Sequence, residues 1–205
     1  MPKYTPKYKA KLKKLIKNKK IYLGDIDTRK ITDMSKLFFK SKRKDFSGIE
    51  NWDTSNVKNM RAMFFGCSDF NQNISSWNVS NVVDMSKMFM RCNSFNQPLD
   101  AWDVSNVCDM SCMFYGCSNF NQNISNWNVK NVRYMNFMFC GCRSFNQPLD
   151  TWDVSNAHNM SFMLADCYNF EQSLYEWKIP IETITDNMLL NCDKIKDFPA
   201  DWIES

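Results

Sequence analysis

The chain has 205 residues and a formal net charge of +4, and 44% of its residues are hydrophobic. No apolar run approaches the roughly 18 consecutive residues that a membrane-spanning helix requires, so no transmembrane segment is predicted. Residues 1–20 contain nine lysines and no acid, which leaves 17 basic against 22 acidic residues in the rest of the chain. We therefore expect one elongated domain whose basic character lies at one end.

Residues 1–20 are predicted to form a basic N-terminal capping helix. Thr5 suits the N-cap and Pro6 the first helical position, which predicts a helix over residues 5–18. Its apolar residues recur at helical spacing and would cover the open end of a repeat array: Tyr8, Leu12, Leu15 and Ile16. The lysines on the other face could instead bind an anionic polymer, although the absence of arginine disfavours nucleic acid. Residues 21–23 are predicted to form a strand that ends in a turn at Gly24.

Residues 21–205 repeat every 25 residues and are predicted to form a single solenoid of about seven repeats. A tryptophan marks the period at Trp52, Trp77, Trp102, Trp127, Trp152, Trp177 and Trp202. A diverged first repeat begins at Ile26, 26 residues before Trp52, and its extra length lies in residues 40–44, which we expect to be a surface loop. The repeat is regular from residue 52 to residue 177, and residues 178–205 are predicted to form a degenerate C-terminal cap.

Each repeat contains two hydrophobic patterns. In residues 60–67 the apolar side chains follow the i, i+3, i+4, i+7 spacing of a short α-helix, which Asn59 would cap. Residues 74–82 have the LxxLxL spacing of a short strand. The predicted fold is an α/β repeat solenoid, leucine-rich-repeat-like, with one short parallel strand and one short helix per turn. Because strands stack at about 4.8 Å and helices at roughly twice that distance, the strands should line a concave face.

Polar residues also recur in columns. The amides equivalent to Asn71, Gln72 and Asn81 can donate to one neighbouring repeat and accept from the other, which predicts a structural role. The column after each tryptophan alternates between carboxylate and amide: Asp53, Asn78, Asp103, Asn128 and Asp153. This alternation separates like charges by about 10 Å, near one Debye length. Alternatively, these carboxylates form an acidic concave face that binds a basic partner. A calcium site is disfavoured, because the motif offers two oxygens and Ca²⁺ needs about six or more.

The reactive residue types favour a structural interpretation. Six cysteines equivalent to Cys67 share one column, which predicts buried thiols, since neighbouring helical turns would lie too far apart for disulfides. The single histidine, His158, stands in a freely varying column and is predicted to be solvated. No nucleophile and base pairing, phosphate-binding glycine loop or zinc-spaced cysteine pair is present. We therefore predict a protein that is not an enzyme and has no cofactor or metal.

The outward positions of the predicted helix are the candidate functional positions. Their apolar members would form a convex stripe of Phe65, Met90, Tyr115, Phe137 and Phe162. Partial burial against adjoining helices is the structural alternative, and a contact surface for a partner or a second copy is the functional one. These five residues and the five of the alternating acid and amide column are the predicted partner-binding residues.

The consensus WDVSNVxDMSxMFxxCxxFNQPL resembles the 25 to 26-residue bacterial surface protein repeat of the BspA-like leucine-rich-repeat family, over about residues 21–202. The resemblance implies a leucine-rich-repeat-like solenoid with a non-enzymatic role in adhesion or binding to a protein or host macromolecule. It also implies display at the cell surface or secretion. The sequence alone predicts a cytoplasmic protein, because it contains no signal peptide or anchor. The alternatives are a self-associating structural protein and an anionic-polymer binder.

Overall fold

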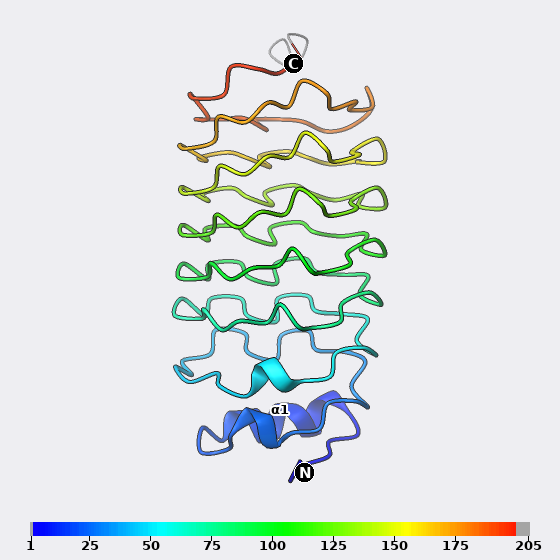
Figure 1. Cartoon of the computed structure of the whole chain (residues 1–205), viewed down its shortest axis with the longest axis vertical. Coiled ribbons are helices and arrows are strands. Elements are labelled where there is room, and N and C mark those ends of the chain that lie inside the picture. Colours follow the sequence, from blue (N-terminus) through cyan, green and yellow to red (C-terminus); the bar gives the residue numbers. More distant parts are fainter. Residues whose placement is uncertain (1, 200–205) are drawn as a thin grey trace.

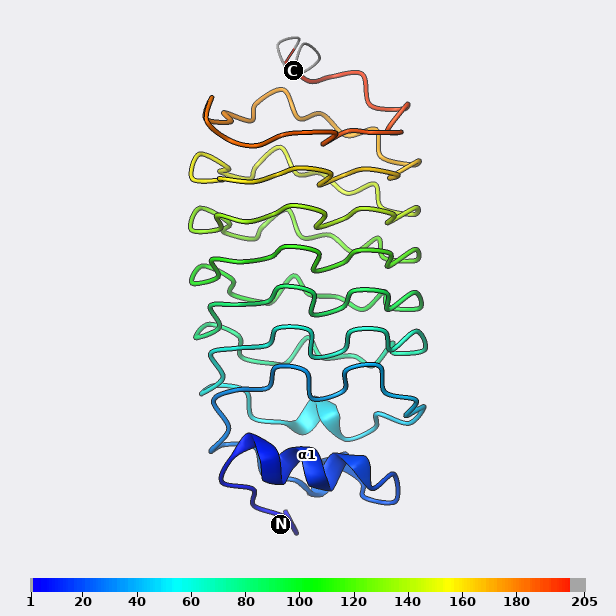
Figure 2. The same cartoon turned by 180° about the vertical axis from the view of Figure 1, so that it is seen from behind.

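The computed structural model describes residues 2–199, which wind as a stack of flattened coils (Figure 1). We call each coil a rung. The defined elements are the α-helix α1 (Lys9–Lys17) and two 3₁₀ helices, η1 (Leu23–Asp25) and η2 (Ile49–Asn51). Helix α1 lies across the N-terminal end of the stack, and the rungs then follow in sequence order to the other end (Figures 1 and 2).

The predicted α/β solenoid, with a strand and a helix in every repeat, is wrong. Within residues 2–199, α1 is the only α-helix, and parallel pairing is confined to isolated bridges. Seven bridge residues form one column along the stack: Asp33, Asn59, Asp84, Asp109, Tyr134, Asn159 and Ile184. The first step in this column is 26 residues and each later step is 25, which confirms the predicted longer first repeat.

Residues 60–67, predicted as a helix capped by Asn59, form a run of β-turns together with that residue. The N–H of Met63 donates to the carbonyl of Met60, three residues back, at 3.1 Å. The φ angles of Ala62 (52°) and Gly66 (71°) lie in the left-handed region, which an α-helix cannot continue through. Successive turns also return side chains to the core every three or four residues, so they reproduce the helical hydrophobic pattern. We call this segment and its equivalents the turn ribbon.

Four backbone hydrogen bonds that run in the same sense join each turn ribbon to the next. The donors in one ribbon are Met60, Ala62, Phe64 and Gly66, and their acceptors in the next are Asp84, Ser86, Met88 and Met90, at 2.8 to 2.9 Å. The same set of four recurs from residues 34–40 to residues 160–166. The predicted concave and convex faces depended on unequal spacing of strands and helices, and this fold has no such repeating pair.

Residues 70–82 and their equivalents form the opposite side of each rung, which we call the tryptophan face. A turn closed by the N–H of Trp77 interrupts the predicted strand. Side chains connect the rungs here: Trp77 Nε1 donates to the Ile49 carbonyl at 3.0 Å, and Asn81 Nδ2 donates to the Ser55 carbonyl at 2.8 Å. The extended backbone is therefore too interrupted to pair as a strand.

The predicted structural role of the amide columns is confirmed. Asn71 Oδ1 accepts the backbone N–H of Asn96 at 2.9 Å and Nε2 of Gln97 at 3.0 Å, both from the following rung. Equivalent pairs recur along the stack from Asn96, Asn121 and Asn146. These side chains replace a backbone ladder, because the turn backbone has few groups aligned along the stack.

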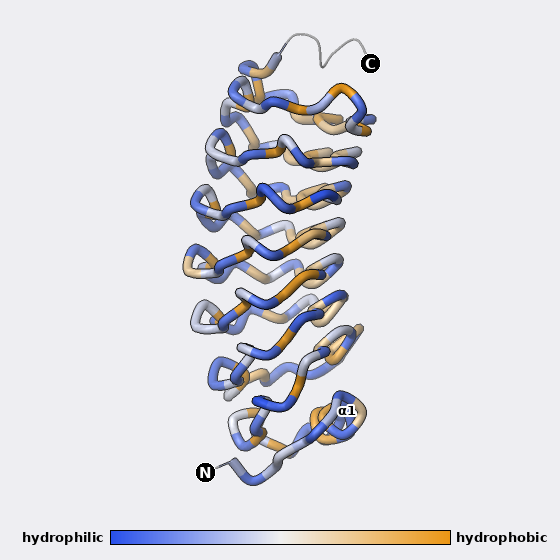
Figure 3. Tube along the Cα trace, turned by 90° about the vertical axis from the view of Figure 1, so that its right-hand side faces the viewer, coloured by the Kyte–Doolittle hydropathy of each residue, from blue (hydrophilic) through white to orange (hydrophobic). Residues whose placement is uncertain are grey.

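The core lies between the two sides of each rung and consists of uninterrupted columns. The rings of Phe64, Phe89 and Phe114 stack face to face with centroids 5.7 and 5.6 Å apart. Apolar and polar residues alternate along both sides of each rung (Figure 3). The hydrophobic prediction is therefore correct for which side chains point inward, although the backbone conformation differs.

Helix α1 begins later than predicted. It starts at Lys9, its N-cap position is Tyr8, and the side chain at that position makes no capping hydrogen bond. Tyr8 is also exposed, whereas Leu12 and Ile16 are buried against the first rung. The predicted strand over residues 21–23 is absent, because Leu23 opens η1 instead.

The segment of residues 40–44, predicted as a surface loop, contains a buried cation. The Arg43 side chain is only 6% exposed and reaches toward α1. Its Nη2 donates to the Ile21 carbonyl at 2.8 Å, and its Nη1 donates to the Ile16 carbonyl at 3.4 Å. Arg43 thus satisfies carbonyls at the end of α1 and fastens the helix to the stack.

The predicted C-terminal cap continues the stack through residue 199. Ile184 forms the last bridge, with Asn159, and Thr183 Oγ1 donates to the Ala157 carbonyl at 2.7 Å. Trp202 and the rest of residues 200–205 lie outside the described residues.

Candidate partner-binding face

The outward side chains of the turn ribbon are free to vary, because the ribbons are joined through the backbone. Two outward columns stand at the second and fifth residues after each ribbon's first buried methionine. The first contains Lys36, Ala62, Lys87, Cys112, Phe137, Phe162 and Asn187, all with φ between 50° and 60°. Left-handed backbone costs a residue with a Cβ about 1–2 kcal/mol, and asparagine tolerates it best.

Two phenylalanines occupy this left-handed column on neighbouring rungs. The rings of Phe137 and Phe162 stack with centroids 4.7 Å apart and an interplanar angle of 4°. Tyr115, from the second column, lies 6.3 Å from Phe137 in a tilted contact. All three side chains are half-buried. Tyr115, Phe137 and Phe162 therefore form one aromatic patch on the outer surface of the turn ribbon.

The other two residues of the predicted stripe lie apart from this patch. Phe65 stacks on Phe39 with centroids 4.7 Å apart, and the Lys40 Nζ lies 5.9 Å from the Phe65 ring. Met90 is half-buried and continues the column between Phe65 and Tyr115. Sequence reasoning missed Phe39, although it stands 26 residues before Phe65, the offset of the diverged first repeat. The ring contacts of the stripe thus form two groups, an aromatic pair near the N-terminal end and the aromatic patch further along, with Met90 between them in the column.

A shallow groove of about 460 Å³ borders the aromatic patch. Tyr115 lines one side, and the floor contains Gly116 and Gly141, whose missing side chains leave the space open. Arg91 and Arg143 stand on its rim, where both side chains are exposed. The groove therefore offers two cations beside an aromatic surface, an arrangement suited to an acidic side chain.

The far side of the groove is ordered by a small polar cluster. The Tyr168 hydroxyl donates to Asp166 Oδ1 at 3.2 Å, and Asn191 Nδ2 donates to the same oxygen at 2.7 Å. The Arg143 guanidinium lies 5.9 Å from the Tyr168 ring. The Asp166 carboxylate raises the pKa of the Tyr168 hydroxyl above its ordinary value. Sequence reasoning missed the groove, although aligned glycines beside outward arginines are a readable signal.

The alternating acid and amide column lies on the tryptophan face and has a local structural role. Oδ1 of each residue accepts the N–H of the residue two positions later, at 2.9 to 3.2 Å: Asp53, Asn78, Asp103, Asn128 and Asp153. All five are exposed. Hydrogen bonds from Ser105 lower the pKa of Asp103, so it stays ionised. The structure does not bring this column together with the aromatic patch, which lies on the opposite side.

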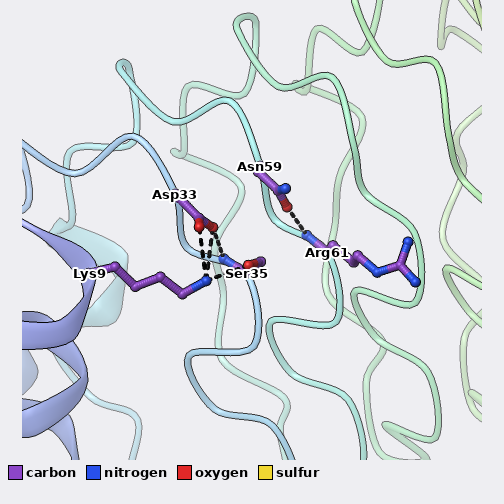
Figure 4. Close-up of polar contacts among 5 residues, drawn as sticks. All are labelled: Lys9, Asp33, Ser35, Asn59 and Arg61. Carbon is purple, nitrogen blue, oxygen red and sulfur yellow. Dashed lines mark hydrogen bonds and ion pairs between the residues drawn. The ribbon is translucent and has the colours of Figure 1, made fainter.

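The predicted N-cap residues of the absent helix have a similar role in the turn ribbon. Asn59 Oδ1 accepts the N–H of Arg61 at 2.9 Å (Figure 4). Asp84 Oδ1 accepts the N–H of Ser86 at 2.8 Å. The sequence thus identified the hydrogen bond correctly but assigned it to a helix start instead of a turn.

The prediction of buried thiols is confirmed. All nine cysteines are free, and those of the repeated column donate to a carbonyl of the preceding rung. For example, Cys92 Sγ lies 3.0 Å from the Phe64 carbonyl oxygen. Burial raises the pKa of Cys67 to about 11 and that of Cys92 well above its usual value. Within the described part of the chain, no group of three His, Cys, Asp or Glu residues is placed to hold a metal ion.

The single histidine is exposed, as the sequence predicts. His158 Nδ1 lies 3.0 Å from the Asn156 carbonyl oxygen, a contact within its own turn. Its ring meets Tyr134 edge to face at 6.3 Å. No carboxylate or nucleophile is paired with the ring among residues 2–199, so the arrangement gives no support for general-base chemistry.

Residues 9–111 and 96–202 each match the family described as "Mycoplasma protein of unknown function, DUF285". The two matches together span most of the chain, and the protein belongs to this family. No curated protein matches the chain. No solved structure matches it either. Across residues 2–199, no helix is both long and apolar enough to cross a membrane.

Proposed function

We propose that this chain is a non-enzymatic repeat scaffold that binds another protein through its turn ribbon. The observation that carries the proposal is the aromatic patch of Tyr115, Phe137 and Phe162. Phe137 and Phe162 have left-handed backbone, which disfavours phenylalanine, and their side chains are only half-buried. The left-handed backbone costs free energy that full burial of the rings does not offset. Such a local cost is expected where a surface has a binding role.

The groove beside the patch supports a partner with an acidic segment. Arg91 and Arg143 have no ion pair within the described residues, so their charges are available to a ligand. Aromatic residues and arginine are the residue types that dominate binding energies at protein interfaces. An aromatic anchor beside two cations favours a peptide that combines an apolar side chain with a nearby carboxylate.

The test is affinity capture with the full chain, in which the partner's recovery is compared between variants. Phe137→Asn and Phe162→Asn remove the patch without backbone strain, because Asn187 occupies the same column at φ 54°. Since an interface aromatic contributes about 2 kcal/mol, the double variant should recover at least about tenfold less partner. Arg91→Gly and Arg143→Ser remove the groove cations with residues found in the same columns, Gly116 and Ser118.

The matched control changes the tryptophan face. Asp103→Asn and Asp153→Asn keep the turn hydrogen bonds, since Asn78 and Asn128 make them in neighbouring rungs. These variants should recover the partner as the wild type does. The proposal would be contradicted if the control variants lost the partner while Phe137→Asn and Phe162→Asn retained it. That result would identify the tryptophan face as the binding surface.

Display at the cell surface, as the repeat resemblance implies, forms the second part of this proposal. At the cell surface an exposed binding face could serve in adhesion. The free cysteines in the core are compatible with such display, because burial protects their thiols from oxidants. Protease treatment of intact cells should cleave the chain if it is displayed. Full protection in intact cells, with cleavage after lysis, would contradict surface display.

A further inference from the structure

The last rung ends in unpaired backbone donors. Each turn ribbon donates four backbone hydrogen bonds to the following rung, and within the described residues no rung follows residues 184–192. In the last ribbon as described, the N–H groups of Thr185, Asn187, Leu189 and Asn191 make no hydrogen bond. They alternate along the chain as the paired donors do in every earlier rung, and they therefore form an open edge.

The first rung ends in the complementary groups. No hydrogen bond is made, in the described residues, by the carbonyls of Asp33, Ser35, Leu37 and Phe39. In later rungs the equivalent carbonyls, such as those of Asn59 and Arg61, accept from the preceding ribbon. The stack thus has four acceptors at one end and four donors at the other, at the same spacing.

We propose that a second copy of this chain stacks its first rung on the last rung, head to tail, and that α1 is the cover that prevents this. In the register of the existing ladder, the N–H of Thr185 meets the carbonyl of Asp33 in the second copy. The N–H of Asn191 then meets the carbonyl of Phe39. Two last rungs cannot pair in this way, because donors would face donors, and two first rungs would place acceptors against acceptors.

Side-chain charges favour the same pairing. The last rung carries exposed acids at Glu182, Asp186 and Asp193. The first rung carries exposed cations at Lys36 and Lys40, which the proposed register places beside Asn187 and Asn191, close in the chain to Asp186 and Asp193. Opposite charges across such an interface both attract the correct partner and fix its orientation.

Helix α1 covers the acceptor edge in the isolated chain. Lys9 Nζ donates to Asp33 Oδ2 at 3.0 Å and to Oδ1 at 3.1 Å, and it also contacts Ser35 Oγ (Figure 4). Leu12 and Ile16 bury the apolar side of the helix against the same rung. A second copy therefore cannot reach the first rung until α1 moves away, which makes the helix an autoinhibitory cover.

The test releases α1 in the full chain and then blocks the other edge. Leu12→Asp with Ile16→Asp places charges on the buried side of the helix. Asn187→Lys with Asn191→Lys adds cations opposite Lys36 and Lys40, and lysine already occupies both columns at positive φ. Asn187→Asp with Asn191→Asp is the matched control of opposite charge. Sedimentation velocity measures the mass of each protein from low to high micromolar concentration.

The released variant should at least double its average mass over this range, whereas the wild type should stay monomeric. Adding Asn187→Lys and Asn191→Lys should return it to a monomer, and the aspartate pair should leave it assembled. A released variant that unfolds cooperatively like the wild type but stays monomeric would overturn the proposal. Assemblies that persist with the lysine pair would also overturn it, because they would not depend on this edge.

A milder variant protects the test against misfolding. Lys9→Ala removes the contacts to Asp33 and Ser35 and leaves the buried side of α1 intact. If the released variant does not fold, Lys9→Ala decides the outcome. A mass that rises with concentration and falls again with Asn187→Lys supports the proposal, and a monomer at all concentrations overturns it.

Discussion

The turn ribbon and the tryptophan face connect the same rungs by different means. In the turn ribbon, backbone groups bond to backbone groups, as between Met85 and Asp109 at 2.9 Å. On the tryptophan face, the bonds need particular side chains, as between Trp102 Nε1 and the Ile74 carbonyl at 3.2 Å. The outward residues of the turn ribbon can therefore change without loss of rung contacts, whereas the tryptophan and asparagine side chains that join rungs on the tryptophan face cannot.

The largest expected effect comes from removing a tryptophan. Trp127 is buried, and its Nε1 donates to the Leu99 carbonyl at 3.0 Å. Trp127→Ala should lower the free energy of unfolding by about 3–5 kcal/mol, measured by urea denaturation. Trp127→Phe keeps an aromatic ring and removes the donor, so its loss should be clearly smaller. Equal losses in both variants would assign the effect to the hydrogen bond and not to packing.

A comparison of two asparagines tests the contrast directly. Asn96 Oδ1 accepts from the Asn121 N–H at 3.0 Å and from Gln122 Nε2 at 2.9 Å. Asn96→Ala leaves both donors without their partner and should destabilise the fold by about 1–3 kcal/mol. Asn136 is a half-buried residue of the turn ribbon, where its backbone carbonyl accepts from Cys112 and no side-chain bond within the described residues joins it to another rung. Asn136→Ala should therefore change the free energy of unfolding by less than about 0.5 kcal/mol, and a similar loss in both would contradict the contrast.

The buried cysteines of the column that contains Cys67 predict a loss of stability at high pH. Burial raises the pKa of Cys67 to about 11, whereas an unfolded cysteine titrates near about 8.5. The unfolded chain therefore loses this proton first as the pH rises, which favours unfolding from about pH 8.5 up to the folded pKa. For this thiol the expected loss at pH 10 is roughly 1–2 kcal/mol. Urea denaturation at pH 7 and pH 10 measures it, and Cys67→Ala should reduce the difference.

The smallest expected effect is in the aromatic patch. Phe162→Asn removes half-buried aromatic surface, which is unfavourable, and relieves left-handed strain at φ 55°, which is favourable. The two terms nearly cancel, so thermal or urea unfolding should show a change within about 0.5 kcal/mol. A decrease of more than about 2 kcal/mol in the free energy of unfolding would show that Phe162 packs as a core residue, and would contradict its proposed binding role.

The sequence predicted the inward side chains well. Met85, Phe89 and Cys92, for example, are buried, as the periodicity indicates for their three columns. The amide bonds and the longer first repeat were also predictable, because a strict period aligns equivalent residues in a stack. These features depend on side-chain identity and spacing, and both can be read directly from the aligned repeats.

The backbone conformation was less predictable, because two conformations share one hydrophobic pattern. Consecutive β-turns and a short helix both return side chains inward at positions such as Met60, Met63 and Phe64. The distinguishing signal is the spacing of left-handed residues, and only Gly66, Gly116 and Gly141 reveal it in the sequence. The groove lies between aligned columns and was readable from its glycines and arginines. The position of Arg43 depends on contacts with residues 16 and 21, which the periodicity does not describe.

The four ladder bonds of each turn ribbon share one direction, which has an electrical consequence. Each peptide group carries a dipole of about 3.5 D, and in the ribbons these groups point their carbonyls toward the N-terminal end. Their sum gives that end a partial negative charge and the opposite end a partial positive charge, as in a helix of reversed polarity. The lysines of α1 lie at the first end, and Asp186 and Asp193 lie at the second. The charged residues thus act as fixed counter-ions to the dipole of the stack, and salt should weaken both ends more than the middle.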